Sequence, residues 1–313
     1  MRDIEDLKSQ MKINPEEISL SLGNFIREHV EKLEREGVIL GLSGGIDSAV
    51  LATLCKRAVG PEKTLALILP ERDSEEEHIR DALDFAKELG IETRLIDITP
   101  HLKKLEIYRL APLSQIPFTR KLRGFLIKKL IKYYERRTGE HPFSASMTGL
   151  RGKEFSSFIS RRTAYYRIKH RMRMVLLYLH GELENRLVIG AANKSEFQIG
   201  YFVRHGCDDA TDIMPLVRLY KTQVRELARY LNIPSKIIDK PPSPDILPGI
   251  VDEEAIGVPY EKLDLILLAL ERGWEKAEIA QTLAIEEKRV MYVRDLVLKS
   301  EHMRKVYVPG APL

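Results

Sequence analysis

The stretch VILGLSGGIDSAV, residues 38–50, decides the fold of this chain. Its first five residues are apolar apart from one glycine, which is typical of a short strand buried in a sheet. Apolar residues return at helical spacing from Ile46 onward, and this pattern stops at Gly60. We therefore expect a strand, a tight turn that contains two glycines, and then a helix.

The same alternation extends outward from this stretch in both directions. An amphipathic helix with an acidic first turn is expected at 15–37, ending at Gly37, and Ser74 is expected to cap a second helix. The other segments with strand or helix patterns are 64–70, 74–90, 91–98, 187–190, 193–202 and 220–234. Strands that alternate with helices predict an α/β fold, a doubly wound parallel sheet with helices on both faces.

Length and composition bound the class of protein. The 313 residues are 44% hydrophobic, which is enough for a real core. No apolar stretch approaches the roughly 20 residues that span a bilayer, and the first ten residues lack the apolar core of a signal peptide. Cys55 and Cys207 are too few for a disulfide framework and have neither a CxxC nor a Cys/His spacing typical of a metal site. We expect a cytoplasmic protein with no membrane partner.

Positive charge is concentrated in one segment. Residues 103–173 contain 19 Lys and Arg but only four Asp and Glu, although the whole chain has a net charge of only +4. Aromatic residues interleave with these charges, so RNA is one possible partner. A different alternative is DNA binding, because residues 274–297 are similar to a helix-turn-helix.

The basic segment also suggests how the chain is divided. Its expected parts are the first half of a nucleotide-binding domain at 1–104, a basic insertion at 105–165, the second half at 166–258, and a helical tail at 259–313.

The glycine-rich turn SGGIDS is suited to phosphate. Backbone N–H groups at the start of a helix carry partial positive charge, and glycines let a phosphate approach them closely. The turn lacks the lysine of the GxxxxGK[ST] loop, which argues against a mononucleotide kinase or a GTPase.

The turn resembles the SGGxDS signature of the PP-loop ATP pyrophosphatases at every defining position. These enzymes cleave ATP to AMP and pyrophosphate while they activate an oxygen of their substrate as an adenylate. The resemblance implies that the amides around Ser43, Gly44, Gly45 and Ser48 hold the pyrophosphate. It also implies that Asp47 holds Mg²⁺, which neutralises the crowded phosphoryl oxygens.

Six further blocks narrow the resemblance to one family, the ammonia-dependent NAD synthetases. They occur in the order and at the spacing of that family: RIKHRMRMVLLY, GAANKSEFQIGYF, LYKTQVRELARYL, KPPSPDILPG, DEEAIGVPYEKLD and SEHMRK. The resemblance implies a ligase that forms a C–N bond, with ATP, Mg²⁺, deamido-NAD and free ammonia as its reactants. It also implies a homodimer.

The same resemblance assigns roles on the ATP side. Glu196 would be the second carboxylate on Mg²⁺, Arg171 would contact ATP, and Lys221 would neutralise phosphate charge as pyrophosphate leaves. Ser243 would place its hydroxyl on the phosphates. From the placement of the expected strands, adenine would lie near Leu67. Pre-placed cations of this kind stabilise charge that develops in the transition state.

The sequence departs from the family where the acceptor would bind. The family loop KYGDGGxD reads RHGCDDATD at residues 204–212, so its substrate-contacting aspartate falls on Cys207 or Asp208. The family motif HKR reads His302-Met303-Arg304, and GTGN reads GAAN. The residues expected to bind the acceptor are Arg167, Arg204, Asp208, Asp212, His302 and Arg304. The ATP half is kept and the acceptor half is altered, so another carboxylate, or RNA, stays an alternative substrate.

Overall fold

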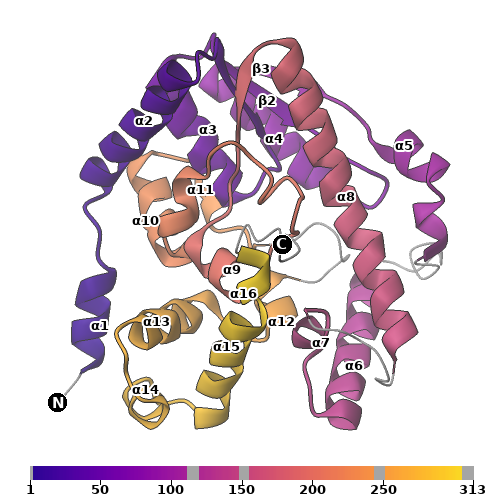
Figure 1. The fold of residues 1–313 in the computed structure, drawn as a ribbon, viewed down its shortest axis with the longest axis vertical. Helices are drawn as coiled ribbons and strands as arrows, with labels where there is room; N and C mark the ends of the chain where they lie inside the picture. The colour runs from indigo at the N-terminus through magenta and orange to yellow at the C-terminus, as the bar shows by residue number, and fades with distance from the viewer. Residues whose placement is uncertain (1–2, 111–119, 148–154, 243–250, 305–313) are drawn as a thin grey trace, which may run out of the picture.

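The computed structural model describes residues 3–110, 120–147, 155–242 and 251–304 (Figure 1). Its centre is one sheet of four parallel strands in the order β3-β2-β1-β4. The strands are β1 (Gly37–Gly41), β2 (Thr64–Ile68), β3 (Glu92–Leu95) and β4 (Arg186–Ile189). The predicted parallel α/β architecture is confirmed.

The strand order places a topological switch point between β1 and β4. The chain leaves β1 toward β2 on one side, whereas β4 is added on the other side after more than a hundred residues. In open parallel sheets the crevice at such a point, at the carboxyl ends of the strands, is where ligands bind. The loop after β1, which the sequence predicts to bind phosphate, therefore lies in the crevice where sheets of this kind bind ligands.

Alternate residues of the strands enter two different cores. Val38 and Leu40 of β1 pack with α2 (Pro15–Lys32), α3 (Ile46–Val59), α4 (Glu76–Leu89) and α10 (Lys221–Tyr230) on one face. Ile39 packs with α5 (Thr99–Lys104), η1 (Ile107–Leu110) and α8 (Ser156–Leu183) on the other face. Because successive strand side chains point to opposite faces, these runs of apolar residues bury both faces of the sheet.

Two of the predicted boundaries are wrong. Helix α2 ends at Lys32, since Glu34 takes a left-handed φ of 51°, and Gly37 begins β1 instead of ending the helix. A side chain at Gly37 would lie 2.3 Å from the carbonyl oxygen of Lys63, which explains the glycine there. Ser74 does not cap α4; its hydroxyl accepts a hydrogen bond from the amide of Glu71, 3.1 Å away.

Helices from both ends of the chain form the lower left part of the molecule in Figure 1. α13 (Tyr260–Glu271), α14 (Lys276–Thr282), α15 (Glu287–Lys299) and α1 (Ile4–Met11) share one apolar core. α14 and α15, where a helix-turn-helix was considered, bury Ile279 and Val290 in that core. The other elements are α6 (Arg120–Thr138), α7 (Pro142–Ala145), α9 (Lys194–Ile199), η3 (Pro215–Arg218), α11 (Ser235–Ile238), α12 (Asp252–Ile256) and α16 (Glu301–Arg304).

The expected basic insertion contributes α6, α7 and the start of α8. Helix α8 runs without a break through residue 165, so the insertion shares a helix with the second half of the sheet domain. Across the described ranges, no helix has the length and apolar character that crossing a membrane demands.

Candidate active site

The loop between β1 and α3 is held in shape by its own side chains. The Ser48 hydroxyl donates to the carbonyl of Gly45 at 2.9 Å and accepts from the amide of Ser43 at 3.2 Å. Gly44 has φ +78°, and a Cβ there would lie 2.3 Å from the carbonyl oxygen of His78. The loop therefore needs glycine at this position, for its backbone conformation and for space.

Three side chains from three different helices meet beside this loop. The Nζ of Lys221 lies 2.5 Å from the Oδ2 of Asp47 and 2.9 Å from the Oε1 of Glu196. The lysine side chain is 2% exposed, and the two carboxylates are 17% and 16% exposed. The structure thus brings together the three residues that the sequence predicted for metal and phosphate charge, although they are far apart in the chain.

The first turns of three helices position these three side chains. Asp47, Glu196 and Lys221 each lie in the first turn of their helix, α3, α9 and α10 respectively. The dipole of each helix places partial positive charge at its first turn, although side chains already accept from the amides of Glu196, Lys221 and Thr222. Such a region favours a polyanion.

Asn193 connects two of the helix starts. Its side-chain oxygen accepts from the amide of Glu196 at 3.0 Å, which caps α9. Its side-chain nitrogen donates to the Oδ1 of Asp47 at 3.0 Å. Asn193 is fully buried, so it fixes the distance between the two acidic residues.

The third helix start is anchored in a similar way. The amide of Lys221 donates to the hydroxyl of Ser195 at 2.8 Å, and that hydroxyl donates to the buried carboxylate of Asp264. Asp264 also accepts from the amide of Thr222 at 2.9 Å. This network attaches α10 to α9 and to α13.

Burial and neighbouring charges shift the pKa values of the cluster. Burial raises the pKa of Glu196 to about 7; Lys221 lowers it, while Asp47 and Asp252 raise it further. Burial alone would lower the pKa of Lys221, but Asp47, Glu196 and Asp252 together raise it above its ordinary value. Lys221 is therefore charged at neutral pH. Its positive charge favours the ionised forms of the neighbouring carboxylates, which burial disfavours.

The donor set of this cluster fits Mg²⁺. Asp47 and Glu196 both direct a carboxylate oxygen at one cation, the Lys221 ammonium. Mg²⁺ prefers oxygen ligands and is usually held by one or two carboxylates together with substrate phosphates. Tyr260 keeps Glu196 in place, since its hydroxyl donates to the Oε1 at 3.1 Å.

A cavity of about 450 Å³ opens from this cluster toward the lower half of the molecule. Ser43, Gly45, Ser48 and Leu67, for which the sequence predicts contact with ATP, are among the residues that line it. Apolar and aromatic side chains of α6 and α8 also line it: Ile127, Leu130, Ile131, Tyr134, Phe158 and Ile159. A cavity that combines apolar walls with charged groups, here Asp47, Glu196, Lys221 and the arginines Arg162, Arg167 and Arg173, suits a nucleotide and an anionic acceptor.

Comparison with known proteins agrees with this geometry. The sequence matches the family model described as NAD synthase over residues 18–112 and 128–307. The chain belongs to the NAD synthase family.

Its relatives in this family are similar over nearly their whole length. The NH(3)-dependent NAD(+) synthetase of Thermotoga maritima is 41% identical over 91% of this chain and 96% of its own. That of Methanocaldococcus jannaschii is 36% identical over 92% and 94%. Among solved structures, the NMN synthetase of Francisella tularensis is 30% identical with a TM-score of 0.69, covering 96% of this chain and 99% of its own. The NH3-dependent NAD synthetase of Campylobacter jejuni is 27% identical with a TM-score of 0.65, covering 96% and 100%.

Some residues that the resemblance to NAD synthases assigns to substrates lie elsewhere. Arg171 does not line the cavity; its Nη2 donates to the carbonyl of Arg204 at 3.2 Å, which holds the loop 201–212 against α8. Arg167 does line the cavity, and it donates to the carbonyl of Ser146 at 3.3 Å. The contact of Arg171 with ATP stays a prediction.

Other residues expected at the substrates make structural contacts instead or lie on the surface. Asp212 accepts from the amide of Val188 at 2.8 Å, at the edge of β4. Arg304 donates to the carbonyls of Gln198 and Val297 and so attaches α16 to α9 and α15. His302 is exposed, whereas Met303 is buried. Ser243 lies outside the described residues.

Sequence reasoning missed several supporting residues of this NAD synthase site. Asn193, Ser195 and Asp264 were not singled out, although an asparagine directly before a helix is a common cap. Tyr260 and Asp252 were missed as well, because nothing in their local sequence indicates a long-range contact. Asp252 accepts from Tyr201 at 3.1 Å, and its Oδ2 lies 3.3 Å from the Tyr260 hydroxyl, beside Glu196.

Proposed function

We propose that this chain is an ammonia-dependent NAD synthetase that uses ATP to convert the carboxylate of deamido-NAD into an amide. The observation that supports this most strongly is the meeting of Asp47, Glu196 and Lys221 at the SGGIDS loop. The relatives named NH(3)-dependent NAD(+) synthetase, which this chain matches over nearly their full length, support deamido-NAD as the acceptor.

Bound Mg²⁺, held by Asp47 and Glu196, would neutralise part of the charge on the ATP phosphates. The amides at the start of α3 would bind the pyrophosphate portion, and Lys221 would supply a buried positive charge beside it. The acceptor carboxylate then attacks the α-phosphorus, pyrophosphate leaves, and ammonia displaces AMP from the acyl adenylate.

Lys221 has a second role in this proposal. In the absence of substrates it is the counter-ion of both carboxylates. If Asp47 and Glu196 hold Mg²⁺, the Lys221 ammonium group would no longer be needed as their counter-ion and could contact the phosphates. The same lysine would therefore keep the site assembled without ligands and would stabilise the leaving pyrophosphate.

The direct test is to incubate the protein with ATP, Mg²⁺, ammonium and deamido-NAD and to measure AMP and NAD. Equal amounts of both products are expected. Asp47→Asn keeps the side-chain shape but removes the charge, and should lower kcat at least about 100-fold with little effect on folding. Formation of AMP without NAD would contradict the acceptor, and full turnover by Asp47→Asn would contradict the metal assignment.

The same assay distinguishes a second acceptor. The acceptor loop departs from the family pattern, and one of the similar structures is an NMN synthetase. Nicotinate mononucleotide, the acid form of NMN, should therefore be run beside deamido-NAD. A larger kcat/KM for the mononucleotide would reassign the substrate and leave the ATP chemistry unchanged.

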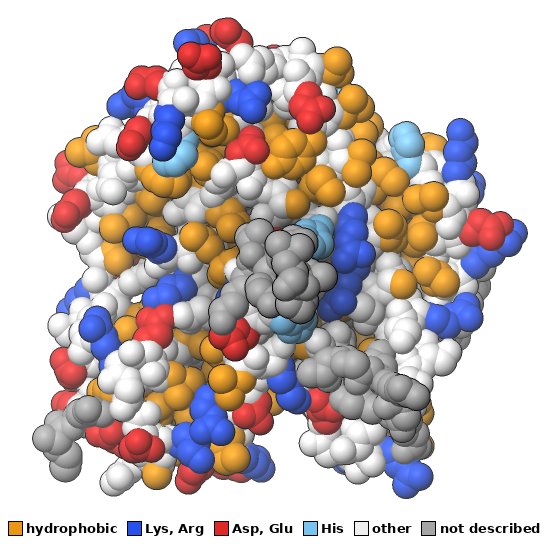
Figure 2. Space-filling model, viewed as in Figure 1, with side chains coloured by type: hydrophobic (Ala, Val, Ile, Leu, Met, Phe, Trp, Pro, Cys, Tyr) orange, Lys and Arg blue, Asp and Glu red, His pale blue; other side chains and the backbone are white. Residues whose placement is uncertain are grey.

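We also propose that two copies of the chain associate through α8. Val175, Leu179 and Leu183 lie four residues apart on this helix and are 52%, 47% and 71% exposed. Leu95 of the neighbouring edge strand β3 is 52% exposed. Figure 2 shows hydrophobic side chains along the upper part of α8. Leu179→Glu should convert a dimer into a monomer in sedimentation, whereas Leu298→Glu, at a 59% exposed position of α15, should not.

The RNA alternative rests on the positive charge and the interleaved aromatic residues of the basic segment. In the described part of α6, apolar side chains line the cavity and Lys128 pairs with Glu254 at 2.7 Å. RNA binding stays a prediction, which salt-dependent retention of RNA on a filter would support.

A further inference from the structure

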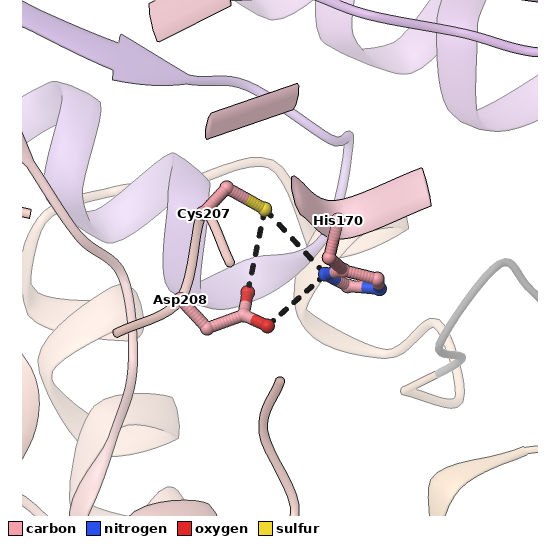
Figure 3. Close-up of side chains that lie close together, drawn as sticks. All are labelled: His170, Cys207 and Asp208. Atoms are coloured by element: carbon pink, nitrogen blue, oxygen red, sulfur yellow. Dashed lines mark hydrogen bonds and ion pairs between the residues drawn. The ribbon is translucent and has the colours of Figure 1, made fainter. Parts of the chain in front are cut away.

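His170, Cys207 and Asp208 form a compact cluster beside the cavity (Figure 3). The Sγ of Cys207 lies 3.5 Å from the Nδ1 of His170 and 3.7 Å from the Oδ1 of Asp208. The Oδ2 of Asp208 lies 3.0 Å from the same Nδ1. Among the described residues, these three side chains form a group of His, Cys and carboxylate ligands close enough to share one metal ion.

These separations are those of ligands around a tetrahedral zinc ion. Zn–S bonds of about 2.3 Å and Zn–N and Zn–O bonds of about 2.0–2.2 Å place neighbouring ligand atoms roughly 3.3–3.6 Å apart. The Sγ–Nδ1 separation of 3.5 Å lies in this range, and the contacts that the two carboxylate oxygens of Asp208 make with Cys207, at 3.7 Å, and with His170, at 3.0 Å, lie within a few tenths of an ångström of it. Three protein ligands leave a fourth position that water or a substrate atom can fill.

We propose that His170, Cys207 and Asp208 bind one thiophilic divalent transition metal, with Zn²⁺ as the typical ion. This site is separate from the Mg²⁺ site, and the proposal does not depend on the ligase activity. Thiolate and imidazole ligands select zinc and similar metals, whereas Mg²⁺ prefers oxygen ligands alone.

The backbone holds the three donors in place before a metal binds. The amide of Cys207 donates to the carbonyl of His170 at 3.2 Å, which fixes the loop residue against α8. The amide of Val203 donates to the Oδ2 of Asp208 at 3.4 Å. A pre-ordered site loses less conformational entropy when it binds a ligand.

Asp208 is already deprotonated before a metal binds, whereas Cys207 must lose its proton. Burial alone would raise the pKa of Asp208, but His170, the amide of Val203 and Arg173 lower it, so this carboxylate is charged. Burial and Asp208 raise the pKa of the Cys207 thiol. Zinc therefore displaces the thiol proton to solvent, the S–H bond is replaced by a Zn–S bond, and no oxidant or reductant is required.

Cobalt is a suitable probe because a Co²⁺–thiolate bond produces a charge-transfer band in the near ultraviolet. The chain contains only two cysteines, so a band can come only from Cys207 or Cys55. Cys55 is 0% exposed in the core of the sheet domain. Metal-free protein should be titrated with Co²⁺ in excess Mg²⁺, then with Zn²⁺ and finally with EDTA.

We expect one Co²⁺ per chain, a thiolate band that Zn²⁺ abolishes by displacement, and full reversal by EDTA. Cys207→Ser should lose the band, and the matched control Cys55→Ala should keep it. Asp208→Asn should keep the band but weaken Co²⁺ binding at least about tenfold, the loss typical even for outer partners of metal ligands.

Absence of a band with the unaltered protein, or its persistence in Cys207→Ser, would overturn the proposal. Thermal unfolding of each variant without metal shows whether a lost band reflects a lost fold. If Cys207→Ser is unfolded, the Asp208→Asn titration decides, because an unchanged Co²⁺ affinity there would also overturn the site.

Discussion

The ammonium group of Lys221 lies 2.9 Å from the Oε1 of Glu196, where the first turns of α9 and α10 meet. The same group bonds Asp47 from α3, so one buried cation connects three helices. Breaking a buried ion pair by removing one partner typically costs 3–5 kcal/mol, because the other charge is left uncompensated.

Lys221→Met should therefore lower the free energy of unfolding by about 3–5 kcal/mol without divalent cations, since two buried carboxylates lose their counter-ion. Mg²⁺ should restore part of this loss. Urea denaturation with and without Mg²⁺ measures both effects. Lys288→Met removes an ion pair with Glu286 whose partners are 81% and 70% exposed, so its effect on the free energy of unfolding should be far smaller. Equal losses in the two variants would refute the counter-ion role.

Glu196→Gln keeps the size of the side chain but removes its charge. Because a metal held by two carboxylates loses one of them, the Mg²⁺ concentration for half-maximal activity should rise about tenfold or more. The measurement is a Mg²⁺ titration of AMP formation at saturating ATP. Glu287→Gln, at an exposed position of α15, is the control. If the two titrations coincide, Glu196 is not a metal ligand.

Gly44→Ala tests the loop geometry against a matched glycine. Gly44 and Gly90 both have positive φ, 78° and 69°, so alanine at either position has a backbone cost of about 1–2 kcal/mol. Only at Gly44 would the Cβ meet a backbone oxygen, 2.3 Å away at His78, while nothing lies within 4 Å at Gly90. Gly44→Ala should therefore raise the KM for ATP at least about tenfold, whereas Gly90→Ala should leave it unchanged. Equal KM values would show that the loop tolerates a side chain.

His141→Gln tests a pH dependence of stability. Burial lowers the pKa of His141 to about 4, and its side chain is 11% exposed. The unfolded chain therefore binds this proton more tightly, and stability is lost as pH falls from about 6.5 toward about 4. Between pH 7 and pH 5 the loss due to His141 should be on the order of 2 kcal/mol.

The measurement is the difference in unfolding free energy between His141→Gln and the unaltered protein at both pH values. Other titrating groups are common to the two proteins and cancel. His101→Gln, at an exposed position, should show no such difference. A constant difference across this pH range would mean that the folded and unfolded chains bind the His141 proton equally tightly, so that burial does not lower its pKa.

Local sequence patterns were sufficient for the sheet and for the phosphate loop. The apolar run of β1, the glycines after it and the periodicity of α3 act within a few residues, so they are readable without the rest of the chain. They failed at Gly37 and Ser74, because the reasons for those residues are contacts with Lys63 and Glu71.

The sequence by itself determined the parallel α/β fold, the SGGIDS turn and, through resemblance, the identity of Asp47, Glu196 and Lys221 as a set. Only the tertiary structure decided that Lys221 bridges the two carboxylates, that Asn193 and Tyr260 support them, and that Arg171 holds a loop. It also decided that Cys207 and Asp208 meet His170, 37 residues away. The physical reason is that backbone periodicity is local, whereas burial, ion pairing and metal geometry depend on side chains that only the packing of distant helices brings together.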